Sequence, residues 1–173
     1  MLQEVLNYSR SFGVKIIGTP ANSIMGIVLV GKGNLKEGLR IYEEGRQSYI
    51  EKERRWCYAL SEYILGTIYF EISKGDRPKR FSFIARNLVF MVRNLPFLSK
   101  KSEYHLNKSI ATAKEIGAKI TLGMAYLNLG LLHKSKKRSA KARECICEAI
   151  DVFDRCGAGV YLKQSKEALA SLN

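Results

Sequence analysis

A Gly-Lys-Gly sequence at residues 31–33 is the first place where residue types and spacing could do chemistry. It follows the apolar run 25–30 and precedes a segment with helical periodicity from Leu35. A strand, a glycine-rich loop and a helix N-terminus in that order can hold a phosphate. A phosphate-binding loop, however, needs Gly-x-x-x-x-Gly-Lys-Ser/Thr, and no hydroxyl residue follows Lys32. A dinucleotide site needs a third glycine, which is missing after Gly33. The sequence favours a turn between two helices and predicts no bound cofactor, although "IVLV" alone could also be a strand.

The cysteines and histidines form no set that indicates catalysis or metal binding. Cys145 and Cys147 are two residues apart, so on a helix they lie on nearly opposite faces. The spacing indicates buried thiols in a reducing compartment rather than a disulfide or a metal site. His105 and His133 belong to different segments, and neither is accompanied by a serine or paired carboxylates in a catalytic pattern. We therefore expect no metal site and no enzyme activity in this segment.

Positive charge is the unusual feature of the composition. The chain has 29 Lys and Arg against 16 Asp and Glu, a net charge of +13. One cluster lies near residues 74–80 and 100–101; the other comprises Lys134, Lys136, Lys137, Arg138, Lys141 and Arg143. Solvated turns are commonly basic, so the first interpretation is solvation. Phosphate contact would instead give salt-sensitive, sequence-independent binding of nucleic acid.

The elements that position these residues belong to one helical domain. The chain has 173 residues, of which 46% are apolar and 26% charged, a composition typical of a globular protein. Only three prolines interrupt it. No apolar run reaches the roughly 20 residues of a membrane span, and the first residues lack a secretory pattern. We expect a cytoplasmic protein without a membrane span.

The sequence repeats with a period of 40 residues. Segments starting at Ser102 and Ala142 have small and apolar residues at the same positions. In one helix of each repeat, a large residue and a glycine precede a bulky residue; in the next helix, small, large and small residues follow at spacings of four and three. The first pattern occurs at residues 25–29, 65–69 and 129–133, and the second at Gly38/Tyr42/Gly45, Ser102/Leu106/Ser109 and Ala142/Ile146/Ala149. Gly117 and Gly157 stand where helices should end. Pairs of helices in close contact are predicted.

These columns resemble the tetratricopeptide repeat (TPR). Residues 126–149 fit best, with Tyr126, Leu129-Gly130, Ala142 and Ala149 in the pattern; His133 replaces a tyrosine and Ile146 a phenylalanine. The resemblance implies an all-α fold, an α-solenoid of about nine helices in the register 1–13, 18–53, 54–117 with an insertion at 75–99, 118–157, and a capping helix at 158–173. The C-terminal half is similar to the TPR regions of large bacterial signalling proteins with an upstream nucleotide-cyclase or AAA-type ATPase domain. Because Leu2 already falls within a repeat, we expect a fragment of a larger protein.

The insertion holds a helix of about 15 residues between Pro78 and Pro96. It is apolar nearly all round, so it is either an added core helix or a docking helix for a partner. Its candidate docking residues are Arg86, Phe90, Met91 and Arg93.

The TPR resemblance implies that first helices line a binding groove. That groove would include Tyr63, Thr67, Phe70, Leu127, Leu131 and Lys134. The sequence therefore favours a protein–protein interaction module, the regulatory region of a signalling protein, which binds a peptide or another domain. The alternatives are nucleic-acid binding through the basic clusters and homodimerisation through the insertion helix.

Overall fold

The computed structural model of the chain describes residues 15–74, 87, 89–91 and 93–172. These residues are helical throughout apart from short turns, which confirms the all-α class. They belong to two compact units, one comprising Met1–Arg54 and Arg77–Leu95 and the other Arg55–Asp76 and Pro96–Asn173. The expected segment 1–13 and most of the insertion lie outside the described residues.

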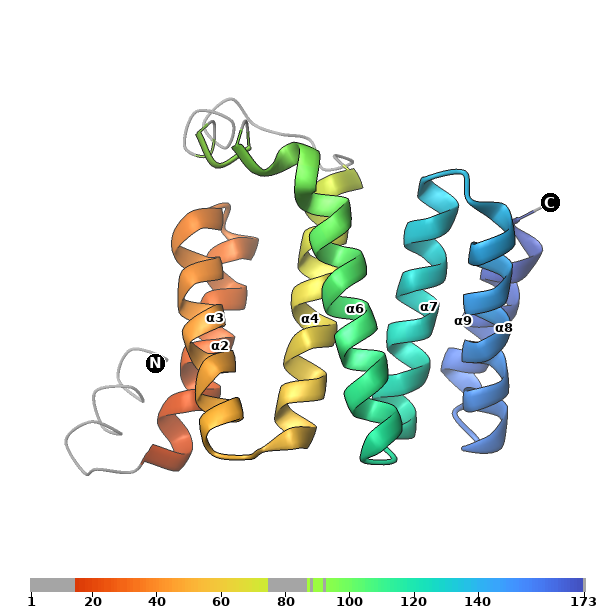
Figure 1. Cartoon of the computed structure of the whole chain (residues 1–173), viewed down its shortest axis with the longest axis horizontal. Helices are drawn as coiled ribbons and strands as arrows, with labels where there is room; N and C mark the ends of the chain where they lie inside the picture. The colour runs from red at the N-terminus through yellow and green to blue at the C-terminus, as the bar shows by residue number, and fades with distance from the viewer. Residues whose placement is uncertain (1–14, 75–86, 88, 92, 173) are drawn as a thin grey trace. The chain divides into compact units, whose positions relative to one another are not determined.

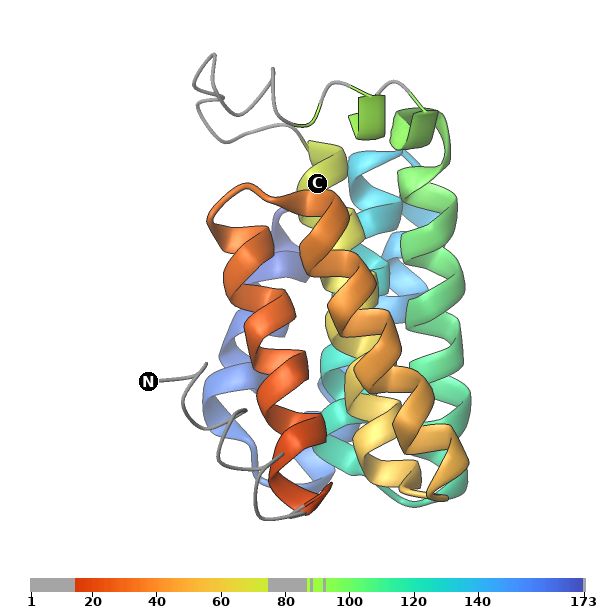
Figure 2. The same ribbon diagram turned by 90° about the vertical axis from the view of Figure 1, so that its left-hand side faces the viewer.

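The first unit contains an antiparallel helical pair. Helix α2 (Lys15–Gly31) contacts α3 (Leu35–Glu51) along its length, as Figure 1 and Figure 2 show from two sides. Residues 25–30 are therefore helical, and 32–34 form the turn that the sequence predicts. The close approach occurs at Gly26: a Cβ there would lie 2.7 Å from the Gly38 carbonyl oxygen. Only glycine permits this backbone contact without displacing α3.

The second unit contains five α-helices that stand side by side in alternating direction (Figure 1). They are α4 (Arg55–Lys74), α6 (Leu98–Glu115), α7 (Lys119–Ser135), α8 (Ser139–Arg155) and α9 (Gly159–Ala170), and a short 3-10 helix, η1 (Leu95–Phe97), precedes α6. Each helix contacts the next, and α7 also contacts α4 and α9. Helices α4, α7 and α9 therefore lie on one side, where α7 touches both α4 and α9, and α6 and α8 cover them.

Small and large residues at the predicted positions form the contacts between these helices. Gly66 lies against Leu106, and Gly130 lies against Ile146. The flanking small residues are fully buried with them: Ser102, Ser109, Ala142 and Ala149. Both serines also bond across the helix pair, Ser102 Oγ to the Gly66 carbonyl and Ser109 Oγ to the Ala59 carbonyl, each at 2.8 Å. This confirms that the columns of the 40-residue repeat are helix contacts.

Each of the five tight turns between described helices contains one residue with positive φ, two positions before the next helix begins. Three of these residues are glycines and two are not: Gly33, Gly117 and Gly157, and Glu53 (φ 52°) and Lys137 (φ 56°). Residues other than glycine rarely adopt this backbone conformation. The turn geometry is therefore kept even where the sequence departs from glycine.

Candidate functional site

Helices α4, α7 and α9 share a face whose side chains are only partly buried. We call this the α4–α7–α9 face and define it by the partly buried Tyr63, Thr67, Asn128, Leu131, Lys134 and Tyr161, together with the exposed Ser171 that follows α9. Asn128 Nδ2 donates to Thr67 Oγ1 over 2.7 Å, which joins α7 to α4. Lys134 Nζ donates to Ser171 Oγ over 2.7 Å, which joins α7 to the residue after α9. The face thus places hydrogen-bonding groups at the contacts between successive helices.

Two tyrosines give this face its aromatic character. The Tyr161 ring stacks on the buried Phe153 ring, with centroids 5.2 Å apart. Burial raises the pKa of the Tyr63 hydroxyl, and hydrogen bonding to Thr67 partly offsets the effect. The Tyr63 hydroxyl therefore stays protonated at neutral pH. Each tyrosine ring offers apolar surface, and each hydroxyl can take part in a hydrogen bond.

The six residues that the sequence assigned to a groove divide between this face and the core. Tyr63, Thr67, Leu131 and Lys134 are partly exposed. Phe70 and Leu127 are only 2% and 8% exposed and belong to the hydrophobic core of the second unit. Asn128 and Tyr161, which the sequence analysis did not single out, lie on the α4–α7–α9 face instead. Neither residue occupies a position of the repeat pattern from which the groove was predicted.

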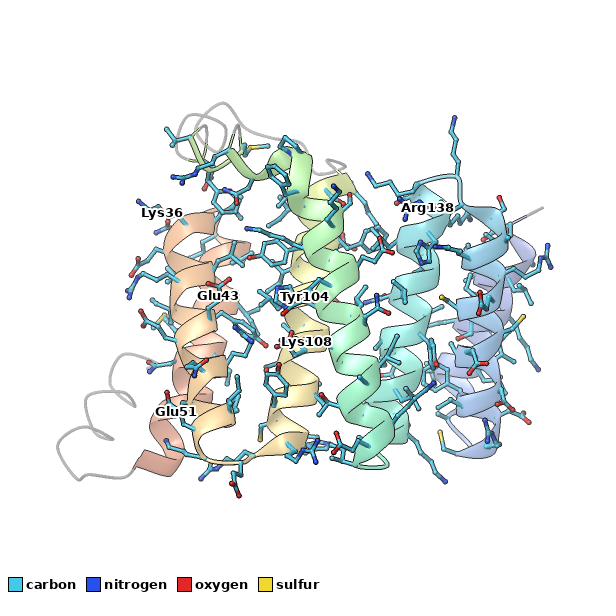
Figure 3. All side chains as sticks on the ribbon, in the orientation of Figure 1. Lys36, Glu43, Glu51, Tyr104, Lys108 and Arg138 are labelled. Atoms are coloured by element: carbon cyan, nitrogen blue, oxygen red, sulfur yellow. The ribbon has the colours of Figure 1, made fainter. Side chains whose placement is uncertain are left out.

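The second basic cluster lies on and beside the turn between α7 and α8, and we call it the basic turn: Lys134, Lys136, Lys137, Arg138, Lys141 and Arg143. All are exposed except the half-buried Lys134, and Figure 3 shows Arg138 at the end of α7. Arg138 lies 3.3 Å from Glu103 on α6. Within the described part of the chain, the ammonium groups of Lys136, Lys137 and Lys141 have no hydrogen-bonding or ion-pair partner. The turn therefore carries positive charge that its own helices do not neutralise.

A buried acid–base pair, Glu62 and His105, joins α4 to α6 and was missed by the sequence analysis. Glu62 is 0% exposed, and its Oε2 lies 2.6 Å from His105 Nδ1. The imidazole stacks on Tyr69, with ring centroids 5.6 Å apart, and meets the edge of Tyr104 at 5.1 Å. Burial raises the pKa of the adjacent Tyr58, and Glu62 adds to that rise. The carboxylate can orient the imidazole, as in many catalytic pairs, but both side chains lie inside the protein.

The helix register contains the signal that would have predicted this pair. Ser102 faces Gly66 and Ser109 faces Ala59, so α6 descends as α4 ascends. Glu62, between the two α4 positions, must then lie opposite His105. The Gly66 and Leu106 positions of the repeat can be recognised in the sequence. Pairing the same two helices in antiparallel direction then places Glu62 opposite His105.

His133 is buried beneath the basic turn, in the position that the repeat gives to Tyr69. It is 4% exposed, and its Nδ1 has no hydrogen-bonding partner among the described residues. Burial lowers the pKa of His133, and the nearby Arg138 and Lys141 lower it further against the opposing effect of Glu103. The ring is therefore neutral at pH 7, in keeping with a packing role.

Asn87 connects the insertion to the turn that the sequence compared with a phosphate site. Its Oδ1 accepts from the Leu35 N–H over 3.1 Å, and its Nδ2 donates to the Gly33 carbonyl over 2.6 Å. Asn87 is 2% exposed. The amide thus fills the N-terminus of α3, where a phosphate would have to bind.

The remaining residues proposed for a docking helix are only partly described. Phe90 and Met91 are half-buried and Arg93 is exposed, whereas Arg86 lies outside the described residues. Val89 is 80% exposed. The helical residues 89–91 therefore include both half-buried and exposed side chains.

The thiols differ from the expectation that all are buried. Cys145 is buried, which raises its pKa to about 11, whereas Cys147 is exposed. The two cysteines are two residues apart on α8 and lie on opposite sides of the helix, as their spacing predicts. The described residues contain no group of three His, Cys, Asp or Glu side chains that could hold a metal ion. Their helices are also too short or too polar to traverse a bilayer.

No protein-family model matches the chain, and no curated protein is significantly similar to it.

Proposed function

We propose that this chain is a TPR-like α-solenoid that works as a non-catalytic protein–protein interaction module. In this proposal the α4–α7–α9 face binds a segment of a partner protein, and the chain is a cytoplasmic regulatory region of a bacterial signalling protein. The proposal draws on the 40-residue repeat, on the TPR resemblance and on the contact of α7 with both α4 and α9.

The observation that carries the proposal is the mixed chemistry of the α4–α7–α9 face. Tyr63, Leu131 and Tyr161 offer apolar surface there, and Thr67 and Asn128 already hydrogen-bond to each other at its centre. Partly exposed aromatic and aliphatic side chains beside fixed polar groups are typical of binding surfaces. The face belongs to packed helices, so a partner would meet a preformed surface.

A non-catalytic role agrees with the position of the Glu62–His105 pair. Both side chains are buried, and the imidazole is enclosed by Tyr69 and Tyr104. We propose that the pair fixes the register of α4 on α6 and does not act on a substrate.

Nucleic-acid binding remains the second candidate, because Lys136, Lys137 and Lys141 lack partners among the described residues. Such binding would weaken steeply as salt rises, since each phosphate contact releases condensed counterions.

A peptide selection tests the proposed face. A library of random 12-residue peptides displayed on phage is panned against the chain, and enriched peptides are synthesised and titrated by fluorescence anisotropy. Leu131→Glu places a charge on the face, and we expect binding at least tenfold weaker. The matched control is Cys147→Glu, which adds the same charge at an exposed position of α8 and should leave binding unchanged.

Failure to enrich any peptide, or equal losses in both variants, would refute the proposal. Circular dichroism of each variant checks that the helices are intact.

A further inference from the structure

Lys134 belongs both to the α4–α7–α9 face and to the basic turn. Its ammonium donates to the neutral hydroxyl of Ser171, so this contact leaves its charge uncompensated. The other cations of the turn follow within ten residues in the sequence. A ligand on the face would therefore meet concentrated positive charge at the end where α7 finishes.

Two arginines elsewhere in the second unit are each neutralised by a neighbouring carboxylate. Arg55 pairs with Glu115, and Arg155 pairs with Asp151. In the basic turn, Arg138 has an acidic neighbour, Glu103, at 3.3 Å. Lys136, Lys137 and Lys141 form no ion pair among the residues that the structure describes. Their positive potential is available to a partner.

Of the side chains that define the face, only Lys134 is charged. Apart from Lys134, its defining side chains are tyrosine, threonine, asparagine, leucine and serine. A nucleic acid that followed the face would place its phosphates beside neutral groups and would be neutralised at one end only. A peptide can match this division, because its charged residues can be confined to one part of its sequence.

We infer that the partner segment is an acidic peptide whose Asp and Glu residues lie at the basic turn while its uncharged part lies along the α4–α7–α9 face. This inference rests on the proposed function and adds the chemistry and direction of the ligand. The lysines act as long, hydrated cations at the rim, so they speed association and select negative charge more than they add packing.

The experiment pans the random 12-residue phage library against the chain at 50 mM and at 300 mM NaCl. We expect the peptides enriched at 50 mM to carry Asp and Glu grouped near one end. The turn reversal is a triple variant, Lys136→Glu, Lys137→Glu and Lys141→Glu, which reverses the charge of the basic turn. It should weaken binding of these peptides at least tenfold at 50 mM NaCl and less at 300 mM NaCl, where screening is stronger. The control reverses three exposed lysines of the same unit, Lys119, Lys163 and Lys166, to Glu. It changes the net charge equally and should have a much smaller effect.

The outcomes separate the inference from the proposed function. Enriched peptides that lose binding with Leu131→Glu but carry no acidic group, or tolerate the turn reversal, overturn the inference and leave the face as a binding site. Equal losses in the two triple variants also overturn it, because net charge would then explain the effect. Failure to enrich peptides overturns both. Finally, a 20-residue oligodeoxythymidine is titrated at 50 mM NaCl. If it binds, loses binding with the turn reversal and displaces the selected peptides, nucleic acid is the partner and the inference is wrong.

Discussion

Adding one methyl group at Gly130 tests the close approach of α7 and α8. An alanine Cβ there would lie 2.5 Å from Ile146 Cγ1 and 3.1 Å from the Ala142 carbonyl oxygen. Carbon atoms normally rest about 3.5–4.0 Å apart, so the new methyl overlaps Ile146 by about 1 Å. Ile146 and Ala142 are both fully buried and cannot turn toward solvent. The helices must separate, or Ile146 must leave its preferred rotamer.

The magnitude follows from two opposing effects. Overpacking of a filled core costs about 1–3 kcal/mol. Alanine is favoured over glycine inside a helix by about 1 kcal/mol. We expect Gly130→Ala to lower the free energy of unfolding by about 1–2 kcal/mol. Gly159→Ala is the matched control, because that glycine is also helical but its added Cβ would meet no atom of another helix within 4 Å.

The assay is urea unfolding followed by circular dichroism, with Ile146→Ala added to complete a double-mutant cycle. Ile146→Ala alone should cost about 2–5 kcal/mol because it leaves a cavity. In the double variant the methyl group added by Gly130→Ala has room, so the combined loss should fall short of the sum by about 1 kcal/mol or more. Additive losses, or a Gly130→Ala variant as stable as the Gly159→Ala control, would refute the close-packing argument.

Three further outcomes are expected. Asn87→Ala should lower stability by about 1–3 kcal/mol and accelerate hydrogen exchange at the Leu35 amide, because that buried donor loses its acceptor; unchanged exchange at Leu35 would contradict this. Glu62→Leu should cost about 3–5 kcal/mol in urea unfolding, because His105 loses its buried partner, and a cost below about 1 kcal/mol would show that the pair is dispensable. Burial lowers the pKa of His133 from its ordinary 6.5, so the folded state binds its proton less readily than the unfolded state does. Stability should therefore fall as the pH drops from about 6.5 through the lowered pKa; His133→Gln should show a smaller decrease between pH 7 and pH 5, and an equal decrease would rule out this histidine as a source.

The helix contacts could be predicted because their signals are local and repeated. A glycine opposite a large residue recurs at matching positions of the repeat: Gly26 lies against Tyr42, and Gly130 lies against Ile146. The turn at 32–34 was also predictable, since the residues around Lys32 fit neither phosphate motif. These features depend on residue size and spacing, which a sequence displays directly.

The polar contacts could not be found in the same way. Asn87 meets Gly33 and Leu35 from a segment that interrupts the repeat, so no register relates their positions. Asn128 and Thr67 are joined only because α7 lies against α4, and a single polar residue between two leucines carries no periodic signal. Such polar pairs depend on how the helices are arranged in space, whereas the repeat is visible in the sequence only at its small and apolar positions.

The uniform turns bear on how a chain of this kind can change its length. The positive-φ residues at Gly117, Lys137 and Gly157 are 20 residues apart, and a helix begins two positions after each. The block 118–157 therefore begins directly after one such residue, Gly117, and ends at another, Gly157. A tandem duplication of this block would join to itself through a turn that the protein already makes. Recombination could lengthen the chain by two helices without requiring a new kind of connection.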